Sequence, residues 1–185
     1  MRLILKIYTI TLLFFLIACE PAPQVMKLDI KNADLKLTDG IMLYKGKPYT
    51  GNTFFKNDTI VINTASYVNG KKHGEEKRFF YNGNVAVSRS YTNGEPTGTH
   101  KTWWENKQLK SVYDFDEAGN KIGIHREWYR DGRLAKEFHY TNGKEDGTQK
   151  IWNLDGEIEA NYIVINGERF GLIGSVNCKP DNYVD

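Results

Sequence analysis

The chain has 185 residues, a length that suits one domain, and its 25 lysines and arginines nearly balance 23 aspartates and glutamates. This balance removes the global-charge argument for a nucleic-acid-binding protein, so we expect no nucleic-acid partner. With 40% hydrophobic residues but only two cysteines, the protein must be stabilised by packing and hydrogen bonding and not by a disulfide framework.

The chain opens with a short cationic start over residues 1–6, and an apolar run follows over residues 7–17. This profile is typical of a secretory signal peptide and is too short for a membrane-spanning helix. The segment Leu16-Ile17-Ala18-Cys19 resembles the bacterial lipobox, in which the cysteine is acylated and becomes the first residue of the mature protein. We therefore predict a signal peptide over residues 1–18 and lipidation of Cys19. The alternative is an ordinary thiol that follows an ordinary signal peptide.

Acylation at Cys19 would hold the protein on a membrane without spanning it, because several acyl chains together form a durable anchor. We therefore expect a bacterial cell-envelope lipoprotein, with residues 19–40 as its lipidated N-terminus and tether. Glu20 stands where an aspartate would favour retention at the inner membrane, so the outer membrane is preferred. Two of the 25 basic residues lie in the signal peptide, and the mature chain would hold 23 residues of each sign.

A repeat of about 24 residues dominates the rest of the chain. Four glycines separated by 24, 25 and 24 residues mark it, and we call them the repeat glycines: Gly74, Gly98, Gly123 and Gly147. Eleven residues after each of them lies an aliphatic residue: Val85, Leu109, Leu134 and Ile158. Degenerate copies flank these four units, as capping repeats do. The repeat array is therefore predicted over residues 41–173, as about five to six repeats, with a C-terminal tail over residues 174–185.

Two kinds of turn signal fall in each unit. Dipeptides such as Asn82-Gly83, Asp131-Gly132 and Asp155-Gly156 predict tight two-residue hairpin turns, and Asn69-Gly70 and its counterparts predict a wider connection between units. The segments between them are rich in aromatic and β-branched residues and show no helical period. We therefore predict an all-β fold, an elongated single-sheet solenoid of tandem antiparallel β-hairpins.

This pattern resembles the MORN-repeat-variant family, specifically its bacterial branch of antitoxin-repeat proteins. The resemblance covers residues 41–173 and rests on the link at residues 69–74, the aromatic pairs, the turn at residues 131–134 and the closing tyrosine of each unit. It implies a membrane-anchored scaffold that binds a partner protein, and in its narrower form an immunity or antitoxin protein. Such a resemblance specifies architecture far better than activity.

If the predicted tight turns hold, the alternation of side chains separates the sheet into two faces. We expect a packed face that combines three aromatic and three aliphatic residues with three further rings: Phe80, Trp104, Tyr129, Val85, Leu109, Leu134, Tyr113, Phe138 and Tyr162. The opposite face would carry an aromatic ladder, five residues after each repeat glycine: Phe79, Trp103, Trp128 and Trp152. Two residues earlier runs a cationic ladder: Lys77, Lys101, Arg126 and Lys150.

The two ladders have two interpretations. In one, each cation covers its neighbouring ring and keeps a one-layer sheet soluble. In the other, the eight residues form the binding surface for a partner, which we expect to be a protein. The alternative ligand is a lipid headgroup or an envelope polysaccharide.

His100 and His125 share one repeat position, two residues after the repeat glycine, with Glu76 and Gln149 in the adjacent copies. A metal pair and a solvated polar ladder are both conceivable there, but no third ligand has a motif spacing, so we expect no metal. The chain contains no nucleophile elbow, no phosphate-binding glycine loop and no HExxH motif. We therefore predict a protein without catalytic activity and without a cofactor.

Overall fold

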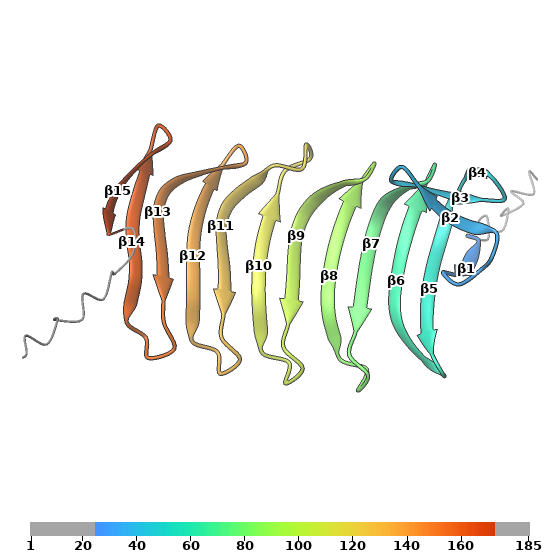
Figure 1. The fold of residues 1–185 in the computed structure, drawn as a ribbon, viewed down its shortest axis with the longest axis horizontal. Coiled ribbons are helices and arrows are strands. Elements are labelled where there is room, and N and C mark those ends of the chain that lie inside the picture. Colours follow the sequence, from blue (N-terminus) through green and yellow to red (C-terminus); the bar gives the residue numbers. More distant parts are fainter. Residues whose placement is uncertain (1–24, 173–185) are drawn as a thin grey trace, which may run out of the picture.

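The computed structural model describes residues 25–172, and their regular structure consists of strands alone (Figure 1). Twelve strands form one long sheet in the order β1-β5-β6-β7-β8-β9-β10-β11-β12-β13-β14-β15, and three form a small sheet, β2-β3-β4. In this part of the chain there is no helix able to cross a membrane. The predicted all-β solenoid of tandem hairpins is therefore confirmed. The predicted signal peptide, Cys19 and the tail lie outside the described residues.

The strand bounds follow the repeat. The long sheet contains β1 (Lys27–Asp29), β5 (Gly51–Asn57), β6 (Ile60–Val68), β7 (Lys71–Phe79), β8 (Val85–Thr92), β9 (Glu95–Trp103), β10 (Leu109–Phe115), β11 (Lys121–Trp128), β12 (Leu134–Thr141), β13 (Lys144–Trp152), β14 (Ile158–Ile165) and β15 (Glu168–Leu172). The small sheet contains β2 (Leu35–Thr38), β3 (Ile41–Tyr44) and β4 (Lys47–Pro48). Only β1 pairs in parallel, with β5, and the other neighbours in both sheets are antiparallel.

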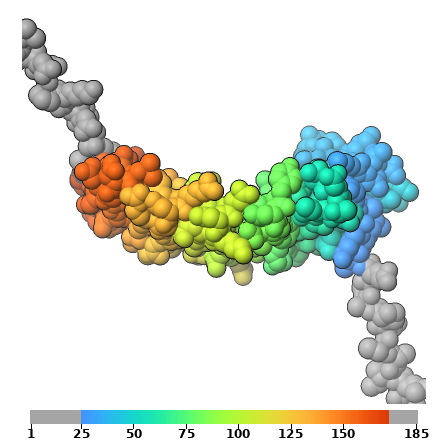
Figure 2. Space-filling model, turned by 90° about the horizontal axis from the view of Figure 1, so that it is seen from below, coloured from blue at the N-terminus to red at the C-terminus, as the bar shows by residue number. Residues whose placement is uncertain are grey.

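The molecule is elongated and gently arched, with the small sheet at its N-terminal end (Figure 2). This small sheet caps the array, because Leu35, Met42 and Tyr49 are buried together with two residues of β6, Ala65 and Tyr67. Main-chain hydrogen bonds from Met42 to Gly70 (2.8 Å) and from Gly70 to Tyr49 (2.7 Å) fix the cap to the first link. Residues 25–40, predicted as part of the tether, contain β1 and β2.

The Asn-Gly links are the tight turns of this fold, contrary to the sequence prediction. Asn69 and Gly70 both have positive φ, 49° and 78°, as a type I′ turn requires, and Val68 pairs directly with Lys71. The counterparts at residues 93–94, 142–143 and 166–167 have the same signs of φ and the same two-residue loop. The prediction of a wider connection at these links was therefore wrong.

The dipeptides predicted to form tight turns lie instead in three-residue loops. The Phe80 N–H donates to the Asn84 carbonyl (2.8 Å), and the Gly83 N–H donates to the Phe80 carbonyl (2.9 Å). Of the dipeptide Asn82-Gly83, only Gly83 has a positive φ. This is a type I turn closed by a bulge. The same Asn-Gly chemistry thus serves two turns, and the conformation of the asparagine decides which one forms.

This extra residue changes which side chains share a face. Phe79 pairs directly with Val85, and the three later repeats place Trp103, Trp128 and Trp152 opposite Leu109, Leu134 and Ile158. The aliphatic residues therefore lie on the same face as the aromatic ladder, and their predicted place on the opposite, packed face was wrong. We call this side the ladder face and the other, which carries the repeat glycines, the core face.

Candidate functional site

The ladder face carries one continuous apolar stripe. Each strand from β7 to β14 contributes one side chain, aromatic on odd-numbered strands and aliphatic on even-numbered strands: Phe79, Val85, Trp103, Leu109, Trp128, Leu134, Trp152 and Ile158. The rings are half-buried, whereas Val85 and Ile158 are 36% and 46% exposed. These strands make their main contacts with their neighbours in the sheet, and no element within residues 25–172 packs over the stripe.

The cationic ladder runs beside the stripe, but half of it is neutralised. Lys77 forms an ion pair with Glu75 (2.8 Å) and Arg126 with Glu137 (2.7 Å). Lys101 and Lys150 form no ion pair with another residue in the described part of the chain. These two lysines lie two repeats apart, and Glu137 stands opposite Lys150 in the pairing of β12 with β13.

The cations do not cover the rings beside them. Within residues 25–172 the cation–π contacts include Lys110 over Trp104 at 4.3 Å and Lys136 over Phe138 at 5.4 Å, but none joins the cationic ladder to the aromatic ladder. The first interpretation of the two ladders, in which each cation shields its neighbouring ring, therefore has no cation–π contact to support it among the described residues.

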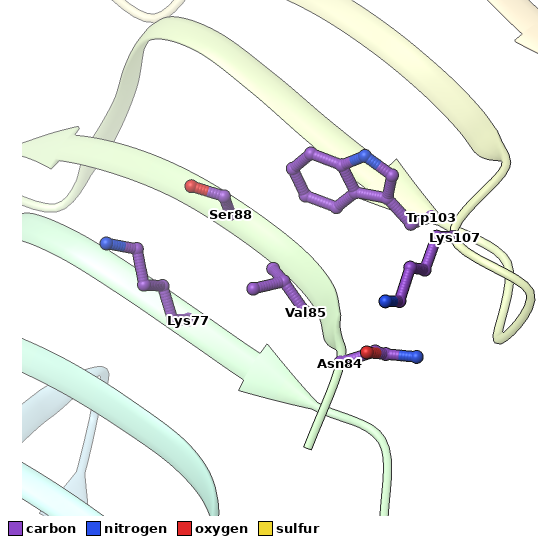
Figure 3. Close-up of a pocket in the computed structure, with 6 residues that line it drawn as sticks. All are labelled: Lys77, Asn84, Val85, Ser88, Trp103 and Lys107. Atoms are coloured by element: carbon purple, nitrogen blue, oxygen red, sulfur yellow. The ribbon is translucent and has the colours of Figure 1, made fainter. Parts of the chain in front are cut away.

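A shallow depression of about 370 Å³ lies where the stripe begins (Figure 3). Its lining combines an indole ring and an aliphatic side chain with two ammonium groups, an amide and a hydroxyl: Trp103, Val85, Lys77, Lys107, Asn84 and Ser88. By their pairing with the cationic ladder, the residues that correspond to Ser88 in the three later repeats are Val112, Glu137 and Asn161. The hydroxyl in the lining of this depression therefore does not recur along the stripe.

The turn edge ties successive repeats together. Trp104 donates its indole N–H to the main-chain carbonyl of Trp128 (3.0 Å), and Tyr129 donates its hydroxyl to that of Trp152 (2.7 Å). These rings were predicted to pack on a sheet face, but they belong to the turns and reach the next repeat. Each bond holds the carbonyl of a ladder residue, so the turn residues fix the spacing of the aromatic ladder.

The polar residues two positions after the repeat glycines are buried on the core face. Glu76, His100, His125 and Gln149 are only 2%, 7%, 4% and 0% exposed, so the prediction of a solvated polar ladder was wrong. The two histidines do not face each other, since the Phe115 ring lies near both, at 4.6 Å from His100 and 5.8 Å from His125. The part of the chain that the structure describes contains no cluster of three potential metal ligands.

Bulges at the repeat glycines explain why these buried positions are polar. Gly98 has a φ of 65° and lies where the pairing of β8 with β9 changes register. Such a bulge leaves main-chain groups of the neighbouring strand without their usual partners. His100 Nε2 lies 2.8 Å from the carbonyl oxygen of Ser90, and the Gln149 amide bonds both the N–H (3.2 Å) and the carbonyl (2.9 Å) of His139. These side chains therefore replace missing links of the sheet.

Burial lowers the pKa of both histidines, because each imidazole is enclosed by rings. His100 lies 5.5 Å from Tyr91, and His125 is stacked on Tyr113 at 4.8 Å and lies 4.6 Å from Tyr140. Main-chain hydrogen bonds oppose this shift without cancelling it. Both side chains are therefore held in the neutral form as parts of the sheet.

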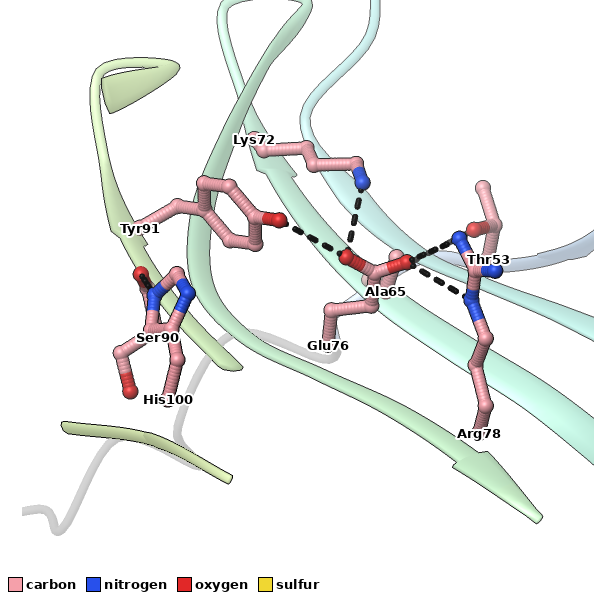
Figure 4. A network of polar contacts seen from close by, with 8 residues as sticks. All are labelled: Thr53, Ala65, Lys72, Glu76, Arg78, Ser90, Tyr91 and His100. Atoms are coloured by element: carbon pink, nitrogen blue, oxygen red, sulfur yellow. Dashed lines mark hydrogen bonds and ion pairs between the residues drawn. The ribbon is translucent and has the colours of Figure 1, made fainter. Parts of the chain in front are cut away.

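Glu76 is the one carboxylate at this repeat position, and three neighbours satisfy it (Figure 4). Lys72 contacts it at 2.9 Å, Arg78 at 3.0 Å, and the Tyr91 hydroxyl donates to it at 3.1 Å. Burial raises the pKa of Glu76, but these contacts outweigh burial and leave it lowered. A similar network joins the Tyr113 hydroxyl to Glu127 at 2.6 Å.

Comparison with known protein families supports the repeat assignment. Residues 72–93 and 121–142 match the MORN repeat variant. The first segment spans most of the β7–β8 hairpin and the second spans the β11–β12 hairpin, so the matched unit is a hairpin of the long sheet. No match was found among curated proteins. The chain therefore contains MORN-type repeats, which make it a repeat scaffold.

Proposed function

We propose that this chain is a non-enzymatic binding protein that presents its ladder face to a partner protein. The observation that carries this proposal is the apolar stripe, which continues over eight strands and is uncovered by other described residues. Large exposed apolar surfaces mark interaction sites, and repeat proteins act through long surfaces of this kind. Lys101 and Lys150 beside the stripe, which form no ion pair within the described residues, would add selectivity for an acidic partner.

The use of the titratable groups supports binding instead of catalysis. An acid–base catalyst must reach its substrate, whereas His100, His125 and Glu76 are buried and bonded within the sheet. Their hydrogen bonds are made to main-chain groups and to a tyrosine hydroxyl within the sheet. The exposed, repeated surface lies on the opposite face.

We further propose that Cys19 is acylated and anchors the protein to the bacterial envelope, at the outer membrane. In this setting the partner is a toxin delivered into the envelope, and the protein acts as its immunity protein. Radiolabelled palmitate incorporated by the wild type but not by Cys19→Ser, with the variant lost from the membrane fraction, is the expected result. Membrane association that survives Cys19→Ser would contradict the anchor.

One observation favours a second candidate, recognition of a lipid headgroup or an envelope polysaccharide. The lining of the depression at Trp103 combines an indole ring with two ammonium groups and a hydroxyl, which is a suitable surface for a sugar or an anionic headgroup. Because the hydroxyl in its lining is replaced by Val112 in the next repeat and by Glu137 in the one after, this candidate accounts for one repeat and not for the whole array.

An affinity capture from the native envelope tests the protein-binding proposal. The wild type is compared with the double variant Trp103→Ala, Trp128→Ala, after circular dichroism has verified the fold of each. The matched control is Tyr81→Ala with Leu154→Ala, which removes two exposed apolar side chains from turns and leaves the stripe intact. A protein captured by the wild type and the control but lost with the two indoles is expected. Capture that is independent of both indoles would overturn the proposal.

A further inference from the structure

We infer that the partner docks on the ladder face through an acidic amphipathic α-helix that lies along the apolar stripe, across the strands. This inference rests on the proposed binding of a partner protein and names the element that binds. It derives from the spacing of the stripe, its continuity from strand to strand and the charges that flank it.

The spacing of the stripe matches the spacing of a helix seam. Neighbouring strands lie about 4.8 Å apart, so one repeat of two strands advances the stripe by about 9.6 Å. Seven residues of an α-helix rise about 10.5 Å, and the two apolar positions of each heptad follow one another every 5 Å or so. One ring and one aliphatic side chain, such as Trp103 and Leu109, would therefore meet the two apolar positions of one heptad.

The length of the stripe sets the length of the helix. From β7 to β14 there are seven strand intervals, which is about 34 Å, or about 23 helical residues. The difference between a heptad and a repeat is about 1 Å, so it sums to only about 3 Å over the stripe. Side-chain adjustment of the rings, and a slight helix bend along the arched sheet, would absorb this difference.

The composition of the stripe favours a helix over a polysaccharide. A sugar chain needs similar polar groups beside each stacked ring, but the position of Ser88 is taken by Val112 in the next repeat and by a carboxylate, Glu137, in the one after. Between the rings lie Leu109 and Leu134, which offer apolar contact and no hydrogen bond. An uninterrupted row of apolar side chains is what the apolar seam of a helix buries.

The charges beside the stripe indicate which charge the helix carries. On the side toward the sheet centre, the row of side chains beside the stripe holds Lys77, Lys101, Arg126 and Lys150 against one carboxylate, Glu137. The turns on the other side are mixed in sign, with Glu105 and Asp155 as well as Lys107. A helix with Asp or Glu on the flank that faces the sheet centre would meet the ammonium groups of that row. Such exposed pairs contribute little affinity each, but they would exclude basic helices and fix the direction of approach.

Photocrosslinking on the full lipid-anchored chain in its native envelope tests the inference. Benzoylphenylalanine replaces Leu109 in one variant and Leu134 in another, because these side chains lie one repeat apart on the stripe. Mass spectrometry then locates both crosslinks in the partner sequence. A helix predicts attachment sites about seven residues apart, in a segment rich in Asp and Glu, whereas an extended strand would place them about three residues apart.

The outcomes separate the two proposals. Sites about seven residues apart support the helix, and any other fixed spacing within one partner protein overturns the helix while the binding function stands. Crosslinks to polysaccharide or lipid alone, together with indole-independent protein capture, overturn both. As a second readout, the partner segment is made as a peptide, and circular dichroism must show a gain of helix when it binds the wild-type chain. Peptide binding without that gain overturns the helix as well.

Discussion

The N-terminal end and the centre of the core face are stabilised in different ways. At β5 and β6 the core face is covered by the small sheet, and Tyr49 and Met42 bury apolar surface against Ala65 and Tyr67. From β8 to β13 no second layer within the described residues covers this face, and the buried side chains are all polar: Gln149, His125, Ser111 and His100. A one-layer sheet has little apolar volume to bury, so satisfied polar groups at the bulges replace a hydrophobic core.

The largest expected effect is at the capped end. Tyr49 is 2% exposed, contacts Tyr44 and Tyr67, and donates its hydroxyl to the carbonyls of Met26 and Asn52. Tyr49→Ala should lower the free energy of unfolding by about 3–5 kcal/mol, because it leaves a cavity in the only two-layer region of residues 25–172. Urea denaturation of the variant measures this loss. Tyr49→Phe, which keeps the ring, should lose only about 1 kcal/mol.

A smaller effect is expected at the polar ladder, the four buried residues Glu76, His100, His125 and Gln149 of the core face. Gln149→Leu keeps the volume of the side chain but leaves the N–H and carbonyl of His139 without partners, so a loss of about 2–3 kcal/mol is expected. Gln149→His is the matched control, since histidine bonds the bulge in the two preceding repeats. Urea denaturation should place the histidine variant closer to the wild type. If Gln149→Leu stabilises the protein, the role assigned to the bulge is wrong.

The polar ladder should also make the central repeats sensitive to pH. The pKa values of His100 and His125 are lowered in the folded state, so the unfolded chain binds more protons once the pH falls below the ordinary histidine value of about 6.5. The contribution of the neutral histidines to stability should therefore be fully present above a pH of about 6.5, and it should decline as the pH falls toward their pKa values in the folded state. The contribution of Glu76 to stability is lost only below its ordinary pKa of about 4.5, which lies below the pH range in which the histidines are protonated in the unfolded chain.

Urea midpoints at pH 7.5 and pH 5.5 test this dependence. The wild type should unfold at lower urea at pH 5.5, and the double variant His100→Gln, His125→Gln should show a smaller difference between the two conditions. Gln149 supplies the precedent for glutamine at this position. A pH difference that is unchanged in the double variant would assign the sensitivity to other groups.

The sequence predicted the repeat and its strands because glycine, asparagine and aromatic positions recur in register. It failed at the turns, because Asn-Gly is compatible with both hairpin loops and only the φ of Asn69 and Asn82 distinguishes them. That error of one residue moved Val85 and its counterparts to the wrong face. The burial of His100 was also missed, since a polar residue in a strand indicates solvent unless the bulge beside it is known.

The smallest expected effect on stability belongs to the ladder face, and this is what separates the two faces by role. Lys101→Glu with Lys150→Glu breaks no ion pair found within residues 25–172. Because Lys150→Glu places a carboxylate opposite Glu137, the free energy of unfolding should fall, but by less than about 1 kcal/mol. Capture of an acidic partner should nevertheless fall, because the substitutions place like charges on the flank of the stripe.

The control for that experiment is Lys101→Gln with Lys150→Gln, which removes the attraction without adding repulsion and should give an intermediate loss of capture. Binding of the wild type should also weaken as salt is raised, and this salt dependence should be smaller in the glutamine variant. If both variants bind as the wild type does, the cations only keep the sheet soluble. The apolar stripe would then have to account for the selectivity of this face on its own, which a hydrophobic surface does poorly because it lacks directional contacts.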